Sequence, residues 1–336
     1  MSKFSLDVLQ KHVFPYTHSN DPDVVLGAAF GEDVALTRIG DDILASHVDP
    51  IVGAIGNIGW LAVHVACNDI ATSGVQPRWI HMLVLVPHME DIELLENIMK
   101  DARRAADEIG VSIVGGHTGY SAGISRPLVS VTALGAARGQ SPVRTGGAQV
   151  GDKVLITKGV ALEGTAILAE DFTDIAWDKC LSEDEIAQAA ALMGDVSVVK
   201  EALAMAANGV TAMHDVTRGG VLETLLEIAA LSNVSIEVNM EYMPIPDIVK
   251  RFSTAMDYDP LRMISSGTLA VTVPPDRVED VKKALDELGI VHAFVGEVKE
   301  GKGVKVFGAG HEVDHHEQIR CEEDELARLW ALYPRD

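Results

Sequence analysis

Two aspartates flank a predicted β-hairpin and could together bind a divalent cation. The strand-like runs VALTRI (34–39) and ILASHV (43–48) surround a turn centred on Asp41, and Asp33 and Asp49 are equidistant from that turn. An antiparallel hairpin would therefore place the two carboxylates side by side. Neighbouring carboxylates repel unless they are solvated, protonated or bridged by a cation. The pattern fits a magnesium site, and two ordinary solvated loop aspartates are the alternative.

A second polar pair lies near the end of an apolar helix. The periodicity predicts a helix over 57–73, with Asn57 as N-cap and Gly74 as the C-terminal stop. Asn68 and Asp69 fall in its last turns, where the helix dipole disfavours a carboxylate and the neighbouring residues are apolar. A divalent cation would compensate, because magnesium prefers oxygen ligands. A salt bridge or an exposed helix end is the alternative.

Two glycine-containing strings each follow a predicted strand and could bind phosphate. They are GGHT (115–118) and HDVTRGG (214–220), and the second also opens a helix. Backbone amides at such positions form an anion-binding concavity, to which an arginine and threonine hydroxyls would add donors. The candidate phosphate contacts are Gly115, Gly116, His117, Thr118, Thr217, Arg218, Gly219 and Gly220. Asp215 could reach the same cation. Neither string is a Walker A loop or a Rossmann fingerprint, and a tight turn that merely begins an element is the alternative.

The remaining polar candidates are predicted to be structural. The three cysteines form neither a disulfide framework nor a zinc pattern, which indicates a reducing compartment. Cys67 and Cys180 are predicted to be small core residues, and Cys321 lies in the tail. His64 and His81 are expected to pack or cap within the first domain.

Composition excludes several classes of protein. The chain has 336 residues, 47% of them hydrophobic and 23% charged, which is typical of a folded globular protein. Its formal net charge of −23 argues against nucleic-acid and anionic-membrane binding, so an anionic substrate would need a local metal ion. No apolar segment is long enough to span a membrane and the N-terminus lacks a signal-peptide core, so we expect a cytoplasmic protein.

The elements that position these residues alternate between strands and helices, which predicts a mixed α/β fold in two domains. Strands are predicted at 80–86, 111–115, 126–137, 153–158, 210–213, 234–238, 268–273, 291–298 and 303–307. Helices are predicted at 90–109, 161–170, 184–208, 219–232, 275–288 and 322–333. A glycine-rich polar stretch near 138–152 separates the domains. The predicted organisation is an arm (1–25), an N-terminal domain (26–145), a C-terminal domain (150–310) and a tail (311–336).

Taken together, the strings resemble the superfamily of aminoimidazole ribonucleotide (AIR) synthetase, selenophosphate synthetase, thiamine monophosphate kinase and the hydrogenase maturation factor HypE. They are GEDVAL (31–36), SHVDP (46–50), NIGWLAVHVACNDIATSG (57–74), GGHT (115–118), GDKVLITKG (151–159) and HDVTRGG (214–220). The resemblance implies an AIR-synthase-like fold, with an N-terminal mixed sheet that pairs into a barrel in a homodimer and a C-terminal α/β sandwich.

The resemblance also implies a reaction, in which ATP phosphorylates an oxygen of a small substrate with Mg²⁺ bound. Asp33, Asp49, Asp69 and Asp215 match the metal-binding aspartates, and Asn68 lies beside them. The residues matching catalytic positions are Asp69, Asp215 and Arg218, and ATP would bind across the dimer interface. The chemistry would consist of positioning and charge neutralisation, without a covalent nucleophile.

Within the superfamily the TRGG string looks most like HypE, which dehydrates a carbamoyl group on its C-terminal cysteine. This chain instead ends LYPRD, and Cys321 precedes a predicted helix. His117 resembles the histidine at the matching place in selenophosphate synthetase. That family, however, works through a cysteine or selenocysteine in an N-terminal loop, and no cysteine precedes Cys67 in this chain. We therefore expect a HypE-like enzyme that acts on a small or carbamoyl-type substrate, with a further maturation factor as a candidate partner. A kinase of the thiamine monophosphate kinase type and a non-catalytic nucleotide-binding scaffold are the alternatives.

Overall fold

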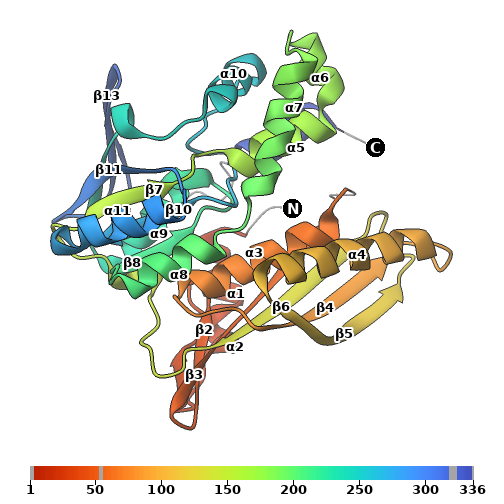
Figure 1. Cartoon of the computed structure of the whole chain (residues 1–336), viewed down its shortest axis with the longest axis horizontal. Helices are drawn as coiled ribbons and strands as arrows, with labels where there is room; N and C mark the ends of the chain where they lie inside the picture. Colours follow the sequence, from red (N-terminus) through yellow and green to blue (C-terminus); the bar gives the residue numbers. More distant parts are fainter. Residues whose placement is uncertain (1–3, 53–55, 318–323, 335–336) are drawn as a thin grey trace. The chain divides into compact units, whose positions relative to one another are not determined.

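The computed structural model describes residues 4–52, 56–317 and 324–334, and the chain forms two compact units. The N-terminal unit comprises Thr17–Ala29 and Asp33–Pro142. The C-terminal unit comprises Val143–Asp336 together with Met1–Tyr16 and Phe30–Glu32. Each unit contains one mixed sheet together with helices (Figure 1), which confirms the predicted mixed α/β fold.

The N-terminal unit is a six-stranded sheet with two long helices. Its strands are β1 (Val24–Leu26), β2 (Ala35–Ile39), β3 (Asp42–Val52), β4 (Trp79–Val86), β5 (Ser112–Tyr120) and β6 (Leu128–Ala136), in the order β1-β2-β3-β6-β4-β5. The helices are α3 (Ile58–Thr72) and α4 (Ile92–Ile109). The β4 and β5 strands are parallel because α4 supplies the crossover between them, and the other pairs are antiparallel.

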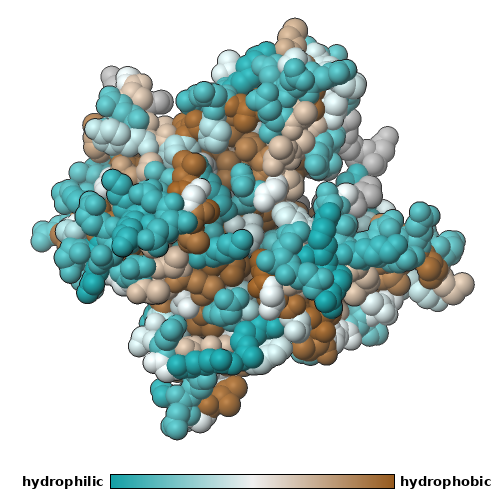
Figure 2. All heavy atoms as spheres, viewed as in Figure 1, coloured by the Kyte–Doolittle hydropathy of each residue, from teal (hydrophilic) through white to brown (hydrophobic). Residues whose placement is uncertain are grey.

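The two helices of this unit differ in how their residues divide between core and solvent. Every residue of α3 is buried, which its nearly continuous apolar sequence explains. In α4 only Ile98, Ala102, Ala105 and Ala106 are buried, and the outer face of the helix is hydrophilic (Figure 2). Asn57 precedes α3 as predicted, but its side chain makes no capping bond and instead accepts a hydrogen bond from Arg104 at 3.1 Å. Asn57 therefore occupies the predicted N-cap position but does not cap the helix through its side chain.

The hairpin forms, but the predicted register is wrong by one residue. Ile39 pairs with Asp42 and Ala35 with Ser46, so the turn consists of Gly40 and Asp41 alone. Gly40 has φ +62°, a conformation that glycine adopts without strain at the first central position of a two-residue turn. Extending this register places Val48 opposite Asp33, so the symmetry argument for Asp33 and Asp49 does not hold.

The GGHT string was predicted to follow a strand, but it lies inside β5. Gly115 to Thr118 pair with His81 to Val84 of β4, and β5 is an edge strand. Glycine has no side chain and so does not contribute to the alternation of apolar and polar residues by which a strand is recognised. The predicted strand therefore ended at residue 115, before the end of β5. Gly116 has φ +149°, and a Cβ there would lie 1.9 Å from the carbonyl oxygen of Met82. The close approach of β5 to β4 therefore requires glycine.

The C-terminal unit is built on a seven-stranded sheet. Its strands are β7 (Lys153–Thr157), β8 (Ala212–Asp215), β9 (Ser235–Asn239), β10 (Leu269–Val273), β11 (His292–Lys299), β12 (Gly303–Gly308) and β13 (His311–His316), in the order β13-β12-β9-β11-β7-β10-β8. Its α-helices include α1 (Leu6–His12), α5 (Leu162–Asp171), α6 (Thr173–Asp178), α7 (Glu183–Ala191), α8 (Val199–Ala207), α9 (Gly220–Ser232), α10 (Asp247–Met256), α11 (Val278–Glu287) and α12 (Glu325–Leu332). The short α2 (Phe14–Thr17) spans the boundary between the units.

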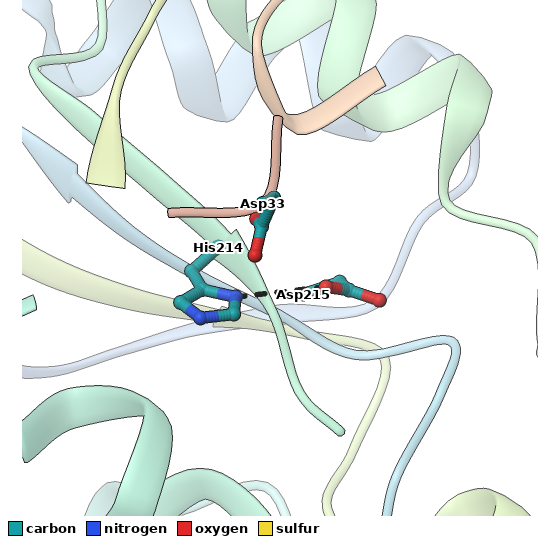
Figure 3. A group of neighbouring side chains, drawn as sticks. All are labelled: Asp33, His214 and Asp215. Carbon is teal, nitrogen blue, oxygen red and sulfur yellow. Dashed lines mark ion pairs between the residues drawn. The ribbon is translucent and has the colours of Figure 1, made fainter. Parts of the chain in front are cut away.

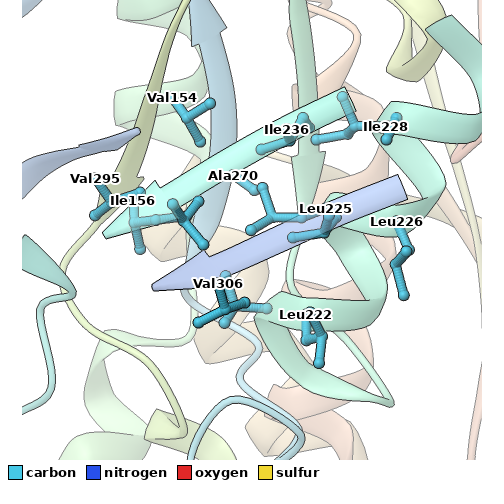
Figure 4. Packing of buried hydrophobic residues seen from close by; sticks show 14 of the residues in the cluster. Val154, Ile156, Leu222, Leu225, Leu226, Ile228, Ile236, Ala270, Val295 and Val306 are labelled. Carbon is cyan, nitrogen blue, oxygen red and sulfur yellow. The ribbon is translucent and has the colours of Figure 1, made fainter. Parts of the chain in front are cut away.

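A hydrophobic core fixes α9 against this sheet (Figure 4). Leu222, Leu225 and Ile228 of α9 pack with strand residues such as Ile156 and Ile236, and these five side chains are at most 3% exposed. The loop between β8 and α9 carries the second glycine string. The packing of α9 therefore sets where Asp215 and Arg218 lie.

Several elements of this unit differ from the prediction. The single helix expected over 184–208 is broken into α7 and α8 by a 3₁₀ turn at Leu192–Asp195, since Gly194 and Asp195 are poor helix formers. Lys158 stabilises the break by donating to the carbonyl oxygens of Asp195 and Ser197 at 2.8 and 2.6 Å. The prediction also missed α6, α10 and the polar strand β13.

Candidate functional site

In the N-terminal unit, a histidine and a threonine connect Asp33 with Asp69. His47 of β3 places its Nε2 atom 3.3 Å from Oδ2 of Asp69, and its Nδ1 atom hydrogen-bonds the backbone oxygen of Asp33. The Thr72 hydroxyl lies 2.9 Å from Oδ2 of Asp33 and 2.7 Å from the backbone oxygen of Asp69. Asp33 and Asp69 are only 8% and 5% exposed. Two carboxylates expected from the sequence thus belong to one connected polar network.

The other two candidates of this unit lie on the same elements. Asn68 is completely buried in α3, one residue before Asp69. Asp49 is half-buried on β3 and pairs with Val131 of β6. Because side chains alternate along a strand, Asp49 shares a face of the sheet with His47, two residues earlier.

Sequence reasoning missed His47 and Thr72, although local signals for both exist. Thr72 follows Asp69 by three residues, so the helix brings both onto one face. His47 precedes Asp49 by two residues within the SHVDP string. The bond from His47 to Asp33 depends on tertiary structure and has no sequence signal.

In the C-terminal unit, Asp215 ends β8 as a buried carboxylate. The side chain is 0% exposed, and neither of its oxygens accepts a hydrogen bond within the described residues. The nearest ionisable nitrogen is Nδ1 of His214, 3.5 Å from Oδ1 (Figure 3), and Nε2 of His214 lies 3.0 Å from Oε2 of Glu227 on α9. A buried carboxylate without hydrogen-bond donors is costly, and a bound cation would remove that cost.

The loop after Asp215 holds Arg218 at the start of α9. Gly219 and Gly220 have φ +87° and +69°, and a Cβ on Gly220 would lie 2.4 Å from the carbonyl oxygen of Leu261. The Gly219 amide donates to Oδ2 of Asp324 at 3.1 Å, and the Gly220 amide donates to the carbonyl oxygen of Thr217 at 3.1 Å. Both glycine amides therefore already have acceptors within the unit.

The first glycine string lies on the surface of the N-terminal unit. Gly115, Gly116, His117 and Thr118 are all exposed on the edge strand β5. The ring of His81 lies over Gly115, since a Cβ there would be 2.9 Å from Nδ1 of that histidine.

The remaining cysteines and histidines divide between core and surface. Cys67 is buried as predicted. Burial, and to a smaller extent the negative charge of Asp69, raises the pKa of its thiol. Cys180 is exposed, so its predicted core position is wrong; it has φ +61° and ends the segment after α6. Cys321 lies outside the described residues. The buried His64 contacts Glu108 at 3.0 Å, which confirms a packing role.

None of the described helices combines the length and apolar composition needed to span a lipid bilayer.

Comparison with known families assigns the class of protein. The model of the AIR synthase related protein, N-terminal domain, matches residues 31–137, and that of the C-terminal domain matches residues 149–309. The chain belongs to the AIR synthase related family. The candidate residues described above in each unit fall inside the matched regions.

The relatives identify the branch of this family. The chain is 30% identical to carbamoyl dehydratase HypE of Rhizobium leguminosarum bv. viciae over 279 residues, which is 80% of this chain and 77% of that protein. It is 28% identical over 284 residues to a putative hydrogenase expression/formation protein of Methanocaldococcus jannaschii, with 81% of each chain covered. Within the family, the chain is most similar to HypE.

Solved structures share the fold. A HypE–HypF complex contains a chain that matches with a TM-score of 0.76 at 24% identity, covering 92% of this chain and 99% of that chain. HypE in complex with ATP matches with a TM-score of 0.69 at 22% identity, covering 94% and 95%. A ThiL protein complexed with AMPPCP and TMP matches with a TM-score of 0.69 at 19% identity, covering 85% and 91%. These likenesses support the AIR-synthase-like fold.

Proposed function

We propose that this chain is an ATP-dependent enzyme of the HypE-like type that transfers a phosphoryl group to an oxygen of a small or carbamoyl-type substrate. The observation that carries the proposal is Asp215, whose buried carboxylate oxygens accept no hydrogen bond within the described residues. Membership of a family that includes the carbamoyl dehydratases supports the reaction class.

In each unit, the acidic candidates are of the residue type that binds magnesium. Asp33, Asp49, Asp69 and Asp215 would supply the hard oxygen ligands that Mg²⁺ prefers, and Asn68 would add a neighbouring amide. When bound, Mg²⁺ would neutralise negative charge on the phosphate oxygens of ATP. His47 and Thr72 keep Asp33 and Asp69 in place before any ligand binds.

The chain's own donors would bind and orient the transferred group. Arg218 offers a guanidinium beside the start of α9, and Thr217 and Thr118 offer hydroxyls. The proposed set also includes Gly115, Gly116, His117, Gly219 and Gly220. The Gly219 amide already donates to Asp324, so we assign phosphate contact chiefly to the side chains of this loop.

The proposal includes an assembly. The proposed N-terminal domain (26–145) would carry Asp33, Asp49 and Asp69 and pair its sheet in a homodimer. The proposed C-terminal domain (150–310) would carry Asp215 and the acceptor-facing loops. The exposed edge strand β5 leaves one margin of the N-terminal sheet open to pairing. Since a HypE has been seen in complex with HypF, we propose a maturation factor of that kind as a partner.

The decisive experiment is calorimetric titration of ATP into the purified protein with and without Mg²⁺, followed by assay of the same sample for released phosphate. We expect Mg²⁺-dependent binding, and Asp69→Asn should abolish it because the change removes a charge without changing volume. Binding without turnover until a metabolite is added would favour a small-molecule kinase. Absence of ATP binding in the wild-type protein would refute the enzyme proposal in favour of a scaffold.

A further inference from the structure

The tail of the chain supplies a buried carboxylate to the loop that carries Arg218. Asp324 is 3% exposed and caps α12 by accepting a hydrogen bond from the Ala327 amide at 2.8 Å. The same Oδ1 atom lies 3.4 Å from Nη1 of Arg218, and Oδ2 accepts from the Gly219 amide at 3.1 Å. All of these atoms belong to the C-terminal unit.

This arrangement places one negative charge between two helix N-termini. Gly219 is the N-cap of α9 and Asp324 is the N-cap of α12, so both helix dipoles favour the carboxylate. The two backbone amides and the guanidinium satisfy it with charge-assisted hydrogen bonds. The contact is therefore a stable part of the fold.

Helix α12 is itself anchored in the C-terminal unit. Leu326 and Leu329 are buried in a core cluster, and the ring of Trp330 packs edge-on against Phe172 with centroids 5.2 Å apart. A phosphate that displaced Asp324 would leave a buried charge unpaired unless this whole helix moved away. Displacement of Asp324 by a phosphate is thus disfavoured. Asp324 therefore fits a role in orienting Arg218 better than a role in competing with the phosphate.

Arg218 keeps donors for a second partner. A guanidinium has five N–H donors, and Asp324 engages only Nη1. Nearly a quarter of the Arg218 side chain, 23%, remains exposed. The positive charge of Arg218 also acts on the buried Glu163, where it lowers the pKa of the carboxyl against the larger raising effect of burial.

We propose that Asp324 is a positioning residue of the catalytic site, which orients the Arg218 guanidinium and fixes the Gly219 amide so that the remaining donors of Arg218 face the transferred phosphoryl group. Helix α12, contributed by the tail, thereby completes the site. This inference rests on the proposed function, since it assigns a role to the same loop.

The test is Asp324→Asn in the full-length protein. Asparagine caps a helix as well as aspartate does, so α12 should remain folded, and the loss of charge should lower the melting temperature only by an amount similar to that of an ordinary buried Asp→Asn change. The Ala327 and Gly219 amides donate to different carboxylate oxygens, one of which becomes an NH2 donor in asparagine, and the new side chain carries no charge for Arg218. We expect kcat to fall by about 10- to 100-fold with little change in KM for ATP, and hydrogen exchange of the Gly219 amide to accelerate.

A double-mutant cycle separates positioning from general support of the fold. In an Arg218→Ala background, Asp324→Asn should cause no further loss of kcat, because the residue acts through the arginine. Ser182→Ala is the matched control, since it removes the N-cap of α7 in the same unit and should lower stability without changing kcat.

Three results would overturn the inference: an unchanged kcat in Asp324→Asn, an equal loss of kcat with and without Arg218, or an increased kcat, which would mark the contact as autoinhibitory. Failure of the proposed function is distinguishable, because it would appear as absence of ATP turnover in the wild type. The exchange rate of the Gly219 amide would still show whether Asp324 orders the loop.

Discussion

Replacing Asp215 with asparagine should stabilise the protein without metal and abolish its response to magnesium. In the metal-free protein the Asp215 carboxylate is buried, its oxygens accept no hydrogen bond among the described residues, and the nearest basic atom is 3.5 Å away on His214. An unsatisfied buried polar group costs about 1 to 3 kcal/mol, and a charged one costs more. Because asparagine keeps the volume and loses the charge, we expect a gain of about 1 to 2 kcal/mol.

The assay is thermal unfolding in buffer with a chelator and again with increasing Mg²⁺. For a unit of this size the expected gain corresponds to a rise in melting temperature of about 2 to 8 °C without metal. The wild type should gain stability with Mg²⁺, by about 2.7 kcal/mol at a hundredfold excess over Kd, because the ion binds only the folded state. Asp215→Asn should show little of this gain, and phosphate release should be lost.

Asp152→Asn is the matched control. Asp152 is also buried in the C-terminal unit, but its Oδ2 atom accepts from the Gln149 amide at 2.9 Å and from the Thr211 hydroxyl at 2.6 Å. Loss of its charge weakens these bonds, so this variant should be less stable than the wild type and keep its response to Mg²⁺. A lower melting temperature for Asp215→Asn in chelator, or an unchanged shift with Mg²⁺, would refute the reasoning.

Further predictions concern both units. Thr72→Val removes the hydroxyl shared by two metal-candidate aspartates, and should lower stability by about 1 kcal/mol and weaken Mg²⁺ binding, as measured by melting with and without the ion. Burial raises the pKa of the Glu163 carboxyl, so the protonated group contributes its stability at low pH. The wild type should therefore lose stability relative to Glu163→Gln as the pH rises above about 4.5. The same dependence of unfolding free energy on pH in both proteins would contradict this. In a Cys321→Ser background, a thiol reagent should modify the exposed Cys180 rapidly and the buried Cys67 only after unfolding, and fast reaction of two thiols would contradict the structure.

Sequence patterns predicted best where periodicity and local propensity agree. The apolar run around Cys67 became a buried helix, and strong alternation in β6 gave a strand within two residues of the predicted limits. They failed where local signals conflict with tertiary contacts. Gly115 and Gly116 interrupt the strand pattern, although pairing with β4 extends β5 through them. A run near Gly194 has a helical pattern, but the helix is broken there and Lys158 binds the carbonyl oxygens left without helical partners.

By itself the sequence determined the chemical types available: acidic ligands for a hard cation, an arginine beside glycines, and the order of strings that marks the family. Those properties are local, because they depend on residue identity and spacing along the chain. Only the tertiary structure decided that His47 contacts both Asp33 and Asp69, and that Asp324 reaches Arg218 from 106 positions away in the chain. Such contacts depend on how α3, α9 and α12 pack, and the free energy that selects this packing comes from burial of apolar side chains far from the site.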